Sequence, residues 1–475
     1  MDADVIVVGA GPTGLLLAGD LACAGVRVTV LEKRPAQLSN LTRAFAVHAR
    51  SMEVLDSRGL ADDLLTTGRA VPRVRLFDRL EIDLDHLPTR FPFVLVTPQY
   101  EVERLLRRRA EDAGAAFRFD TEVTALHQDD RGVTAEVARR DGRGTVRAGY
   151  LVGADGVRSA VRTAVGAPFP GQTVIRAMVL ADVRLAERPP DVLTVASRAG
   201  ALGFLAPFGD GRYRFIGWDG ERAVDAPVET EEIRRIARAT FGTDYGIHDV
   251  TYADRFAADE RQAPHYRYGR VLLAGDAAHA HSPAGGLGMN TGLQDAANLG
   301  WKLAAVVHGA EPTLLDTFEA ERHPVGRQVL RASGTILRLA TRPGPLVATA
   351  RRVLVAVVSR AEPVRRRAAG MVSAIAVSYP RPRRSHPMVG RRASDLALVP
   401  GPHGARLAEA LRAGRFVLVL PRSVGDPGPM TSRPPVSAGE RDATDRVVVE
   451  RADDDPTALL VRPDGYVASA HRAAA

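Results

Sequence analysis

A glycine-rich turn near the start of the chain constrains the fold more than any other feature. Residues 4–8 are a short run of apolar, β-type side chains, and the turn Gly9-Ala10-Gly11-Pro12-Thr13-Gly14 follows them directly. Residues 13–24 then have the character of an apolar helix, and residues 26–31 form a second apolar strand. This order is typical of a βαβ unit. The sequence therefore predicts an α/β fold with a parallel sheet and a dinucleotide lying on the turn.

Each glycine of this turn has its own physical task. Gly9 permits the tight turn, Gly11 lets the backbone approach a pyrophosphate, and Gly14 allows the helix to pack closely on the strand. The N-terminus of the helix then faces the phosphate charge. Glu32 ends the second strand, where a carboxylate can bind ribose hydroxyls. Two neighbours complete this part of the predicted cofactor site: Thr13 and Lys33.

Two later segments carry the rest of the predicted cofactor site. Asp155, in Asp155-Gly156-Val157-Arg158-Ser159-Ala160-Val161-Arg162, follows a predicted strand and can organise the surroundings of a pyrophosphate; Arg162 is a candidate partner for it. Asp276, in Gly275-Asp276-Ala277-Ala278-His279, follows a buried strand and is suited to accept hydrogen bonds from ribityl hydroxyls. One fold must therefore close around one long cofactor, FAD.

The run after Asp276 opens a helix. Its backbone N–H groups can face the electron-rich edge of a flavin and stabilise the negative charge of the reduced form. The predicted flavin contacts in this run are Gly286, Leu287, Gly288, Met289 and Asn290. His279 and His281 lie beside it, and we interpret them as structural hydrogen-bonding residues, because that is the commoner role of a histidine next to a glycine turn.

The charge distribution argues against a nucleic-acid partner. The chain of 475 residues has a formal net charge of +8. Residues 331–392 contain 14 Arg and a single acid, Glu362, so the remainder of the chain is net negative. No basic patch is interleaved with aromatic side chains in the way that base stacking requires. We interpret the Arg cluster at residues 365–367 as a solvated helix face.

Cysteine content and hydropathy exclude further classes. The single cysteine, Cys23, rules out an intrachain disulfide and a cysteine-based metal cluster, and no metal site is predicted. The chain opens without the pattern of a signal peptide. The most apolar later stretch, residues 346–358, carries two arginines and is too short to span a bilayer. We therefore expect a cytoplasmic protein with no membrane partner.

The three cofactor segments resemble those of the FAD-dependent aromatic hydroxylases of the para-hydroxybenzoate hydroxylase type, which are single-component, class A flavin monooxygenases. The likeness covers nearly the whole chain and is greater to the polyketide-tailoring branch, which includes rifampicin monooxygenases and anthracycline or angucycline hydroxylases. It implies that Arg43 lies near the flavin, that Gln99 contacts the ribityl chain and that the backbone of Val123 contacts adenine. Arg43 would help the flavin change position, and Pro283 would help to position the substrate.

The resemblance also implies a domain organisation. A Rossmann-like FAD-binding domain would carry an inserted, mostly antiparallel substrate domain and would be followed by a thioredoxin-like domain. The expected bounds are residues 1–70, 99–175 and 265–345 for the FAD-binding domain, 71–98 and 176–264 for the substrate domain, 346–385 for a helical connection and 386–475 for the C-terminal domain. On the strands of the substrate domain, the predicted substrate contacts are Arg212, Arg214 and Trp218.

The C-terminal domain is expected to have a structural role. Its similarity to longer family members rests on His386-Pro387-Met388-Val389-Gly390-Arg391-Arg392 and Val461-Arg462-Pro463-Asp464-Gly465-Tyr466. Because Cys23 lies far from these residues, the domain cannot perform thiol redox chemistry. We expect it to serve packing or assembly, and the resemblance allows a homodimer.

The reaction implied by the resemblance is oxygenation. NAD(P)H would reduce FAD, O2 would add at flavin C4a, and the hydroperoxide would hydroxylate a small aromatic or polyketide-type substrate. A second glycine turn for a separate nicotinamide domain is missing, which fits class A enzymes. Two alternatives stay open at this point: Baeyer–Villiger or ring-opening oxygenation of a polycyclic or rifamycin-type substrate at the same flavin site, and a flavin-binding protein without oxygenase turnover.

Overall fold

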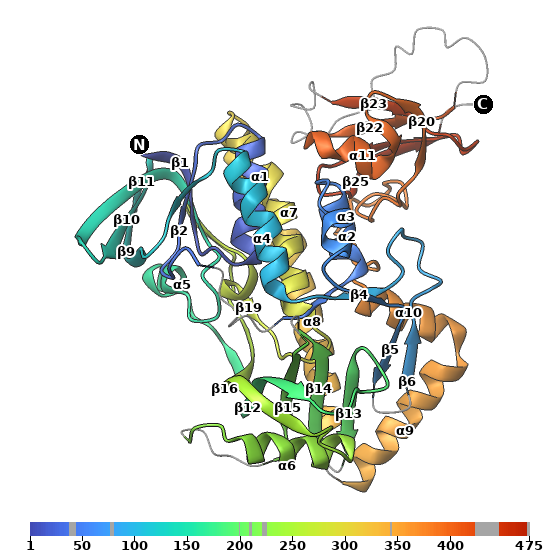
Figure 1. Ribbon diagram of the computed structural model, residues 1–475. Coiled ribbons are helices and arrows are strands. Elements are labelled where there is room, and N and C mark those ends of the chain that lie inside the picture. Colours follow the sequence, from blue (N-terminus) through green and yellow to red (C-terminus); the bar gives the residue numbers. More distant parts are fainter. Residues whose placement is uncertain are drawn as a thin grey trace.

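The computed structural model describes the chain in eight stretches, which are residues 1–37, 44–76, 80–198, 200–208, 211–220, 226–342, 344–422 and 446–472. Figure 1 shows a sheet with long helices packed beside it near the N-terminus, a second sheet at the lower end of the view, and a small separate sheet near the C-terminus. The fold is α/β and has the predicted parts: a Rossmann-like region, where the sequence predicts the cofactor, an inserted antiparallel sheet and a thioredoxin-like C-terminal unit.

The Rossmann-like region is built on a mainly parallel sheet. Its strands, in the order in which they pair, are β17 (Arg267–Tyr268), β18 (Val271–Leu273), β11 (Gly142–Gly153), β1 (Ala3–Val8), β2 (Val28–Leu31) and β8 (Ala116–Arg118). β1 pairs in parallel with β2 and β11, and β11 pairs in parallel with β18. Valine and leucine dominate the central strands, as expected where both faces of a parallel sheet are covered. The antiparallel strands β9 (Glu122–Asp129) and β10 (Gly132–Arg139) extend the sheet beside β11.

This strand order brings the three cofactor segments together. They follow β1, β11 and β18, which are neighbours in the sheet, and the carboxyl ends of parallel strands meet at one edge. Helix α1 (Pro12–Cys23) starts at the first segment, with Pro12 at its first position and Gly11 as N-cap. Helix α7 (Leu287–Val307) starts after the last segment. Figure 1 shows α1 packed against α7 and against α4 (Gln99–Asp112).

The inserted sheet is antiparallel throughout. Its strands, in the order in which they pair, are β13 (Thr194–Arg198), β14 (Ala201–Pro207), β15 (Tyr213–Trp218), β12 (Gly171–Leu185), β16 (Ile247–Gln262) and β19 (His279–Ala280). Helix α6 (Thr230–Phe241) packs on one face through Ile233, Ile236 and Ala237. The predicted domain boundary between residues 175 and 176 falls inside β12, because the pairing of this strand with β16 already begins at Gly171.

Several smaller elements complete this part of the fold. They are β3 (Ala46–Val47), α2 (Ala49–Asp56), α3 (Ala61–Leu65), β4 (Arg69–Val71), β5 (Arg73–Leu76), β6 (Leu80–Asp83), β7 (Val94–Val96) and α5 (Ala160–Ala164). Three helices then follow α7 in the chain: α8 (Asp316–Thr341), α9 (Pro345–Arg360) and α10 (Glu362–Val372). In Figure 1 α9 runs past the β5–β6 hairpin, and α9 and α10 both contact β6. No helix among the described residues is long and apolar enough to cross a membrane.

The C-terminal unit has its own sheet and core. β22 (Val417–Leu420) pairs in parallel with β23 (Val447–Glu450) and antiparallel with β24 (Thr457–Val461), which pairs with β25 (Val467–Arg472). This order, β23-β22-β24-β25, is that of a thioredoxin-like sheet. The remaining elements of the unit are β20 (Ala397–Gly401), β21 (Gly404–Arg406) and α11 (Leu407–Ala410).

Candidate functional site

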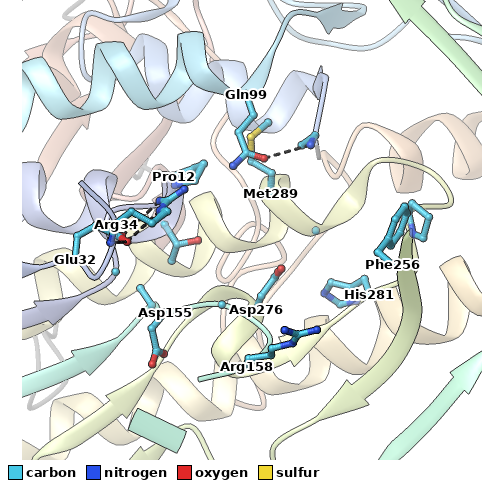
Figure 2. A pocket seen from close by; sticks show the side chains of 18 of the residues that line it. Pro12, Glu32, Arg34, Gln99, Asp155, Arg158, Phe256, Asp276, His281 and Met289 are labelled. Atoms are coloured by element: carbon cyan, nitrogen blue, oxygen red, sulfur yellow. Dashed lines mark hydrogen bonds and ion pairs between the residues drawn. The ribbon is translucent and has the colours of Figure 1, made fainter. Parts of the chain in front are cut away.

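A cavity of about 440 Å³ extends along the carboxyl edge of the parallel sheet. Figure 2 shows Glu32 and Arg34 at one end of this cavity and Phe256 and His281 at the other, so it reaches from the end of β2 to the antiparallel sheet. Fourteen of the residues predicted to contact the cofactor or the substrate line it: Gly9, Gly11, Thr13, Glu32, Lys33, Gln99, Val123, Asp155, Asp276, Pro283, Gly286, Leu287, Gly288 and Met289. We call it the cofactor cavity.

The glycine turn leaves space only where a pyrophosphate would lie. Gly9 has φ +104°, and a Cβ there would be 2.4 Å from the carbonyl oxygen of Ala154. A Cβ on Gly14 would be 2.0 Å from the carbonyl oxygen of Gly9. At Gly11, in contrast, no atom lies within 4 Å of a Cβ position. Gly9 and Gly14 therefore serve backbone packing, and the open space beside Gly11 meets the N-terminus of α1.

Thr13 joins the first cofactor segment to the last. A Cβ on Gly292 would lie 2.2 Å from Thr13 Oγ1, and a Cβ on Gly275 would lie 2.6 Å from the same oxygen. Both glycines thus make room for the threonine side chain, which lines the cavity. The close packing of α1 on α7 depends on these three residues.

Glu32 is held in place by its own backbone surroundings. Its carboxylate accepts hydrogen bonds from the N–H of Ala10 at 2.7 Å and from Arg34, through the backbone N–H at 2.9 Å and Nε at 3.0 Å. Burial acts to raise the pKa of Glu32, but the Arg34 guanidinium and the Ala10 N–H outweigh it and hold the pKa below its usual value. Lys33 is exposed at the rim. Arg34 also lines the cavity, and nothing in the local sequence singled it out.

Gln99 and Asp155 lie at different places along the cavity, as Figure 2 shows. Gln99 begins α4; its Oε1 accepts a hydrogen bond from the N–H of Ala44 at 3.3 Å. Asp155 Oδ2 accepts one from the N–H of Val161 at 3.1 Å, whereas Oδ1 is buried without a hydrogen-bond partner among the described residues. Burial raises the pKa of Asp155.

Arg162 does not form an ion pair with Asp155, contrary to the prediction. Its guanidinium donates to the carbonyl oxygens of Val157 at 2.8 Å and Ala277 at 3.0 Å, and it lies over the ring of Phe169 at 3.8 Å from the centroid. The arginine therefore ties the middle cofactor segment to the last one.

The residues predicted to contact the flavin at the start of α7 have two different roles: some line the cofactor cavity, and Asn290 binds backbone groups. Gly286, with φ +62°, is the N-cap, and the next three residues line the cofactor cavity. Asn290 does not: its Oδ1 accepts from the N–H of His48 at 2.8 Å, and its Nδ2 donates to the carbonyl oxygens of Ala46 at 2.9 Å and Gly286 at 2.8 Å. Because its amide is occupied by these backbone groups, Asn290 fixes the position of β3 against the helix. Arg43 lies outside the described residues.

A second, larger cavity of about 880 Å³ adjoins the first. Its walls come from the β5–β6 hairpin, from the inserted sheet and from α8, α9 and α10. They are mainly apolar, with Ile82, Phe204, Ile336, Leu339 and Met371 as examples. Six residues line both cavities: Phe45, Ala46, Phe204, Pro283, Gly286 and Leu287. We call it the substrate cavity, because a molecule in it would lie directly against a molecule in the cofactor cavity.

Three arginines line the substrate cavity from α8 and α10: Arg327, Arg331 and Arg367. The polar residues that α7 and the N-cap of α2 contribute to it are uncharged. Burial lowers the pKa of His48 to about 4, so its ring is neutral at neutral pH. Gln294 donates a hydrogen bond to the carbonyl oxygen of Asn290 at 3.1 Å, and its Oε1 is buried without a hydrogen-bond partner among the described residues. Asn290 lines this cavity too. Uncharged hydrogen-bonding groups in an apolar wall suit an apolar ligand with a few hydroxyl or carbonyl groups.

The predicted substrate contacts line neither of the two cavities. Arg214 is fully buried, with Nε 2.7 Å from Asp182 Oδ1 and Nη2 2.8 Å from Oδ2, and its guanidinium lies 3.5 Å from the centroid of the Phe208 ring. Trp218 packs against the apolar core of the inserted sheet, and Arg212 lies outside both walls. Ile216 lies between Arg214 and Trp218 on the same face of β15, and its side chain does line the cofactor cavity. The structure therefore places none of the three predicted residues in a cavity wall, and the carboxylate of Asp182 engages Arg214 instead.

The residues present fit FAD on three observations. Open space lies over Gly11 at a helix N-terminus, Asp155 has a buried acceptor oxygen without a partner among the described residues, and the N-terminus of α7 lies at the far end of the cavity. In the part of the chain that the structure describes, no group of three or more His, Cys, Asp or Glu side chains could hold a metal ion.

Comparisons with known proteins agree with this geometry. Residues 2–333 match a family model described as FAD binding domain, and residues 386–475 match one described as aromatic-ring hydroxylase, C-terminal. The 12-dehydrotetracycline 5-monooxygenase/anhydrotetracycline 6-monooxygenase of Streptomyces rimosus is 40% identical over 497 residues, which cover 98% of this chain and 95% of the relative. A rifampicin monooxygenase of Streptomyces venezuelae is 41% identical over 476 residues, covering 98% and 94%. The structure of the anhydrotetracycline hydroxylase OxyS of Streptomyces rimosus superposes with a TM-score of 0.86 at 39% identity, covering 99% of this chain and 96% of that one.

Proposed function

The chain belongs to the FAD-dependent aromatic-ring hydroxylases and is a flavin monooxygenase; from this premise we propose that its substrate is a fused-ring aromatic polyketide and its reductant NAD(P)H. The observation that carries the proposal is the shared wall of the two cavities, at Phe45, Pro283, Gly286 and Leu287. A planar, largely apolar molecule in the substrate cavity would present its edge to the cofactor across this wall. Bound FAD supplies the oxygen-activating chemistry.

The residues of the cofactor cavity have distinct proposed tasks. Glu32 binds the ribose hydroxyls of the adenosine, and the open space beside Gly11 takes the pyrophosphate at the start of α1. Asp155 Oδ1 accepts a hydrogen bond close to the pyrophosphate, and Asp276 accepts from the ribityl hydroxyls. The N-terminus of α7, at Gly286 to Met289, stabilises negative charge at the other end of the cavity. Arg43 keeps the role near the flavin that the resemblance implies.

The substrate cavity sets the proposed substrate class. Its volume of about 880 Å³ admits a ligand with several fused rings. His48 and Gln294 provide neutral hydrogen-bonding groups for phenol, enol or carbonyl oxygens. Pro283, in the shared wall, positions the carbon that receives oxygen. Tetracycline-type and rifamycin-type molecules, which the names of the relatives specify, both fall within this class.

Oxygen insertion into a ring is the second candidate reaction. The name of a relative that is 41% identical, a rifampicin monooxygenase, supplies the rifamycin-type substrate class on which this reaction would act. Both reactions use the same cavity pair. They differ in the product: hydroxylation leaves the ring skeleton intact, whereas Baeyer–Villiger or ring-opening oxygenation changes it.

The deciding experiment measures NADPH and NADH oxidation by the FAD-loaded protein in the presence of anhydrotetracycline, rifampicin and other polycyclic polyketides. We expect at least one compound to accelerate oxidation and to gain the mass of one oxygen atom. Nuclear magnetic resonance of the product then separates hydroxylation from ring insertion. Bound, reducible FAD without acceleration by any of these compounds would contradict the proposed substrate class. We also propose a cytoplasmic location, where NAD(P)H is available, and a homodimer, which sedimentation velocity tests.

A further inference from the structure

A chain of buried polar side chains leads away from the far end of the cofactor cavity. His281 lines the cavity, and its Nε2 lies 2.8 Å from His279 Nδ1. His279 Nε2 lies 2.5 Å from Asp295 Oδ2, and Asp295 Oδ1 accepts a hydrogen bond from Arg322 Nε at 2.7 Å. His279, Asp295 and Arg322 are each fully buried. The local sequence pointed to the two histidines but not to their partners, which come from α7 and α8.

The hydrogen bonds fix where protons reside in this chain. Asp295 accepts from Arg322, His279 and the N–H of Gly275 at 3.1 Å, so it acts only as an acceptor. His279 and Arg322 outweigh burial and lower the pKa of Asp295 to about 2, which keeps it ionised. His279 therefore carries a proton on Nε2. One proton is then shared between His279 Nδ1 and His281 Nε2.

One nitrogen of the pair is left to accept another proton. His281 Nδ1 is buried and has no hydrogen-bond partner among the described residues. Burial and the neighbouring His279 hold the pKa of His281 well below its usual value, so His281 is uncharged at rest. A proton that binds Nδ1 can displace the shared proton to His279 Nδ1. The positive charge then resides on His279, 2.5 Å from the Asp295 carboxylate, instead of on the less favourably placed His281.

His281 lies at the end of the cavity where charge changes during the reaction. The dinucleotide turn and Glu32 define the adenosine end, so the redox-active half of FAD must extend toward the opposite end. Figure 2 shows His281 at that end with Phe256, and Asp276 and Arg158 lie nearby in the wall. Reduction delivers two electrons to this end. A neutral base beside an arriving negative charge gains affinity for a proton.

We propose that the His281–His279 pair takes up one proton from solvent when bound FAD is reduced by two electrons. In the balanced step, a solvent proton binds His281 Nδ1, the proton on His281 Nε2 moves to His279 Nδ1, and the reductant supplies both electrons to the cofactor. Oxidation of the cofactor reverses the transfer. The charged and titratable groups around the pair are Asp295, Arg322 and Tyr266 on the buried side and Asp276 and Arg158 on the cavity side.

The test is the pH dependence of the two-electron midpoint potential of the FAD-loaded protein, measured anaerobically against reference dyes. Each proton taken up per two electrons lowers the potential by about 30 mV per pH unit. We expect the midpoint potential of the wild type to fall more steeply over part of the range from about pH 5 to 8, where histidines titrate. The extra fall, beyond that caused by protonation of the cofactor itself, should be roughly 30 mV per pH unit. His281→Gln should abolish this steeper region. His323→Gln is the matched control, because His323 also packs against Tyr266 but is hydrogen-bonded to the carbonyl oxygen of Ala263 and lies outside the relay.

The outcomes separate the proposal from its alternatives. A wild-type protein without the steeper region overturns it, and so does a His281→Gln protein that retains the region. If His281→Gln does not bind FAD, His281→Asn takes its place, with FAD occupancy measured by absorbance. The proposal rests on FAD binding but requires no turnover. Failure of every polyketide to accelerate NADPH oxidation would therefore leave the proton uptake unaffected.

Discussion

Glu321 of α8 and Arg462 of the C-terminal unit form a two-point ion pair, with Nη1–Oε1 at 2.7 Å and Nη2–Oε2 at 2.9 Å. Lys302 of α7 donates to the same Oε2 at 2.8 Å. Arg462 and Lys302 outweigh burial and lower the pKa of Glu321 to about 2. The carboxylate thus connects the FAD-binding region to the C-terminal unit at a point shielded from water.

Glu321→Gln should destabilise the protein by about 3–5 kcal/mol, because it leaves the buried Lys302 without its counter-charge and leaves Arg462 with only Asp464 as a partner carboxylate. The same carboxylate should also govern acid stability. Its pKa falls from 4.5 unfolded to about 2 folded, so it contributes about 3 kcal/mol above pH 4.5, and this contribution is lost as the pH falls toward 2. Thermal unfolding from pH 7 to 2.5 measures both effects.

Lys302→Met provides the matched control for this pair. It removes one cation and leaves the Glu321–Arg462 contact in place, so we expect a smaller loss of stability than for Glu321→Gln. Burial already lowers the pKa of Lys302 to about 8, which shows that its charge is held at a cost. If the Lys302→Met protein were less stable than the Glu321→Gln protein, the Glu321 carboxylate would not be the group that contributes most to the stability of this cluster.

Gly11→Ala and Gly14→Ala should fail in different ways. A methyl group added at Gly14 would lie 2.0 Å from the Gly9 carbonyl oxygen, so Gly14→Ala should prevent stable folding or lower the melting temperature sharply. A methyl group added at Gly11 would meet no protein atom within 4 Å, so Gly11→Ala should fold normally. That methyl group occupies the space proposed for the pyrophosphate, and FAD affinity should fall at least about tenfold, or 1.4 kcal/mol. Circular dichroism of the FAD-free protein and flavin fluorescence titration separate the two.

The cofactor segments could be predicted from the sequence because backbone geometry dictates them. Gly9 and Gly14 admit no side chain, and Glu32 must end the second strand whatever the rest of the chain does. The partners of Arg214 and His279 could not be predicted. Asp182 and Asp295 lie 32 and 16 residues away along the chain, and only the sheet register and the packing of α7 bring them together.

The substrate cavity was beyond sequence reasoning for the same reason. Its walls combine the β5–β6 hairpin with α8, which the sequence assigns to the FAD-binding domain, and with α9 and α10, which it assigns to a helical connection. Each wall residue is an ordinary apolar side chain on its own element. Strand alternation puts Arg214, Ile216 and Trp218 on one face of β15, but the sequence could not tell Ile216, which lines a cavity, from Arg214, which an internal carboxylate engages.

Arg214→Met should act on stability and not on substrate recognition. It leaves the buried Asp182 carboxylate without its arginine, which costs about 3–5 kcal/mol. The double variant Asp182→Leu/Arg214→Met should recover much of this loss, because it removes both buried charges. Chemical denaturation measures the cycle. If Arg214→Met instead raised KM for the substrate at unchanged stability, the original expectation of a substrate contact would be right after all.

Filling the substrate cavity should separate substrate binding from FAD binding. Ile336 lines only the larger cavity, on α8, well away from the glycine turn. Ile336→Trp should therefore raise KM for a polycyclic substrate at least about tenfold, equivalent to 1.4 kcal/mol, while the dissociation constant for FAD stays unchanged. Steady-state NADPH oxidation and flavin titration give the two numbers.

Val353→Trp is the control for this last variant, because Val353 lies on the exposed face of α9 and is 56% exposed. This substitution adds the same indole group to one of the helices beside the substrate cavity, but the indole does not enter the cavity. The KM of the variant should therefore match that of the wild type. A parallel loss of FAD affinity in Ile336→Trp would mean that the two cavities deform together. An unchanged KM would mean that the substrate occupies some other part of the large cavity, and the wall formed by β6 and α10 would then be the next to fill.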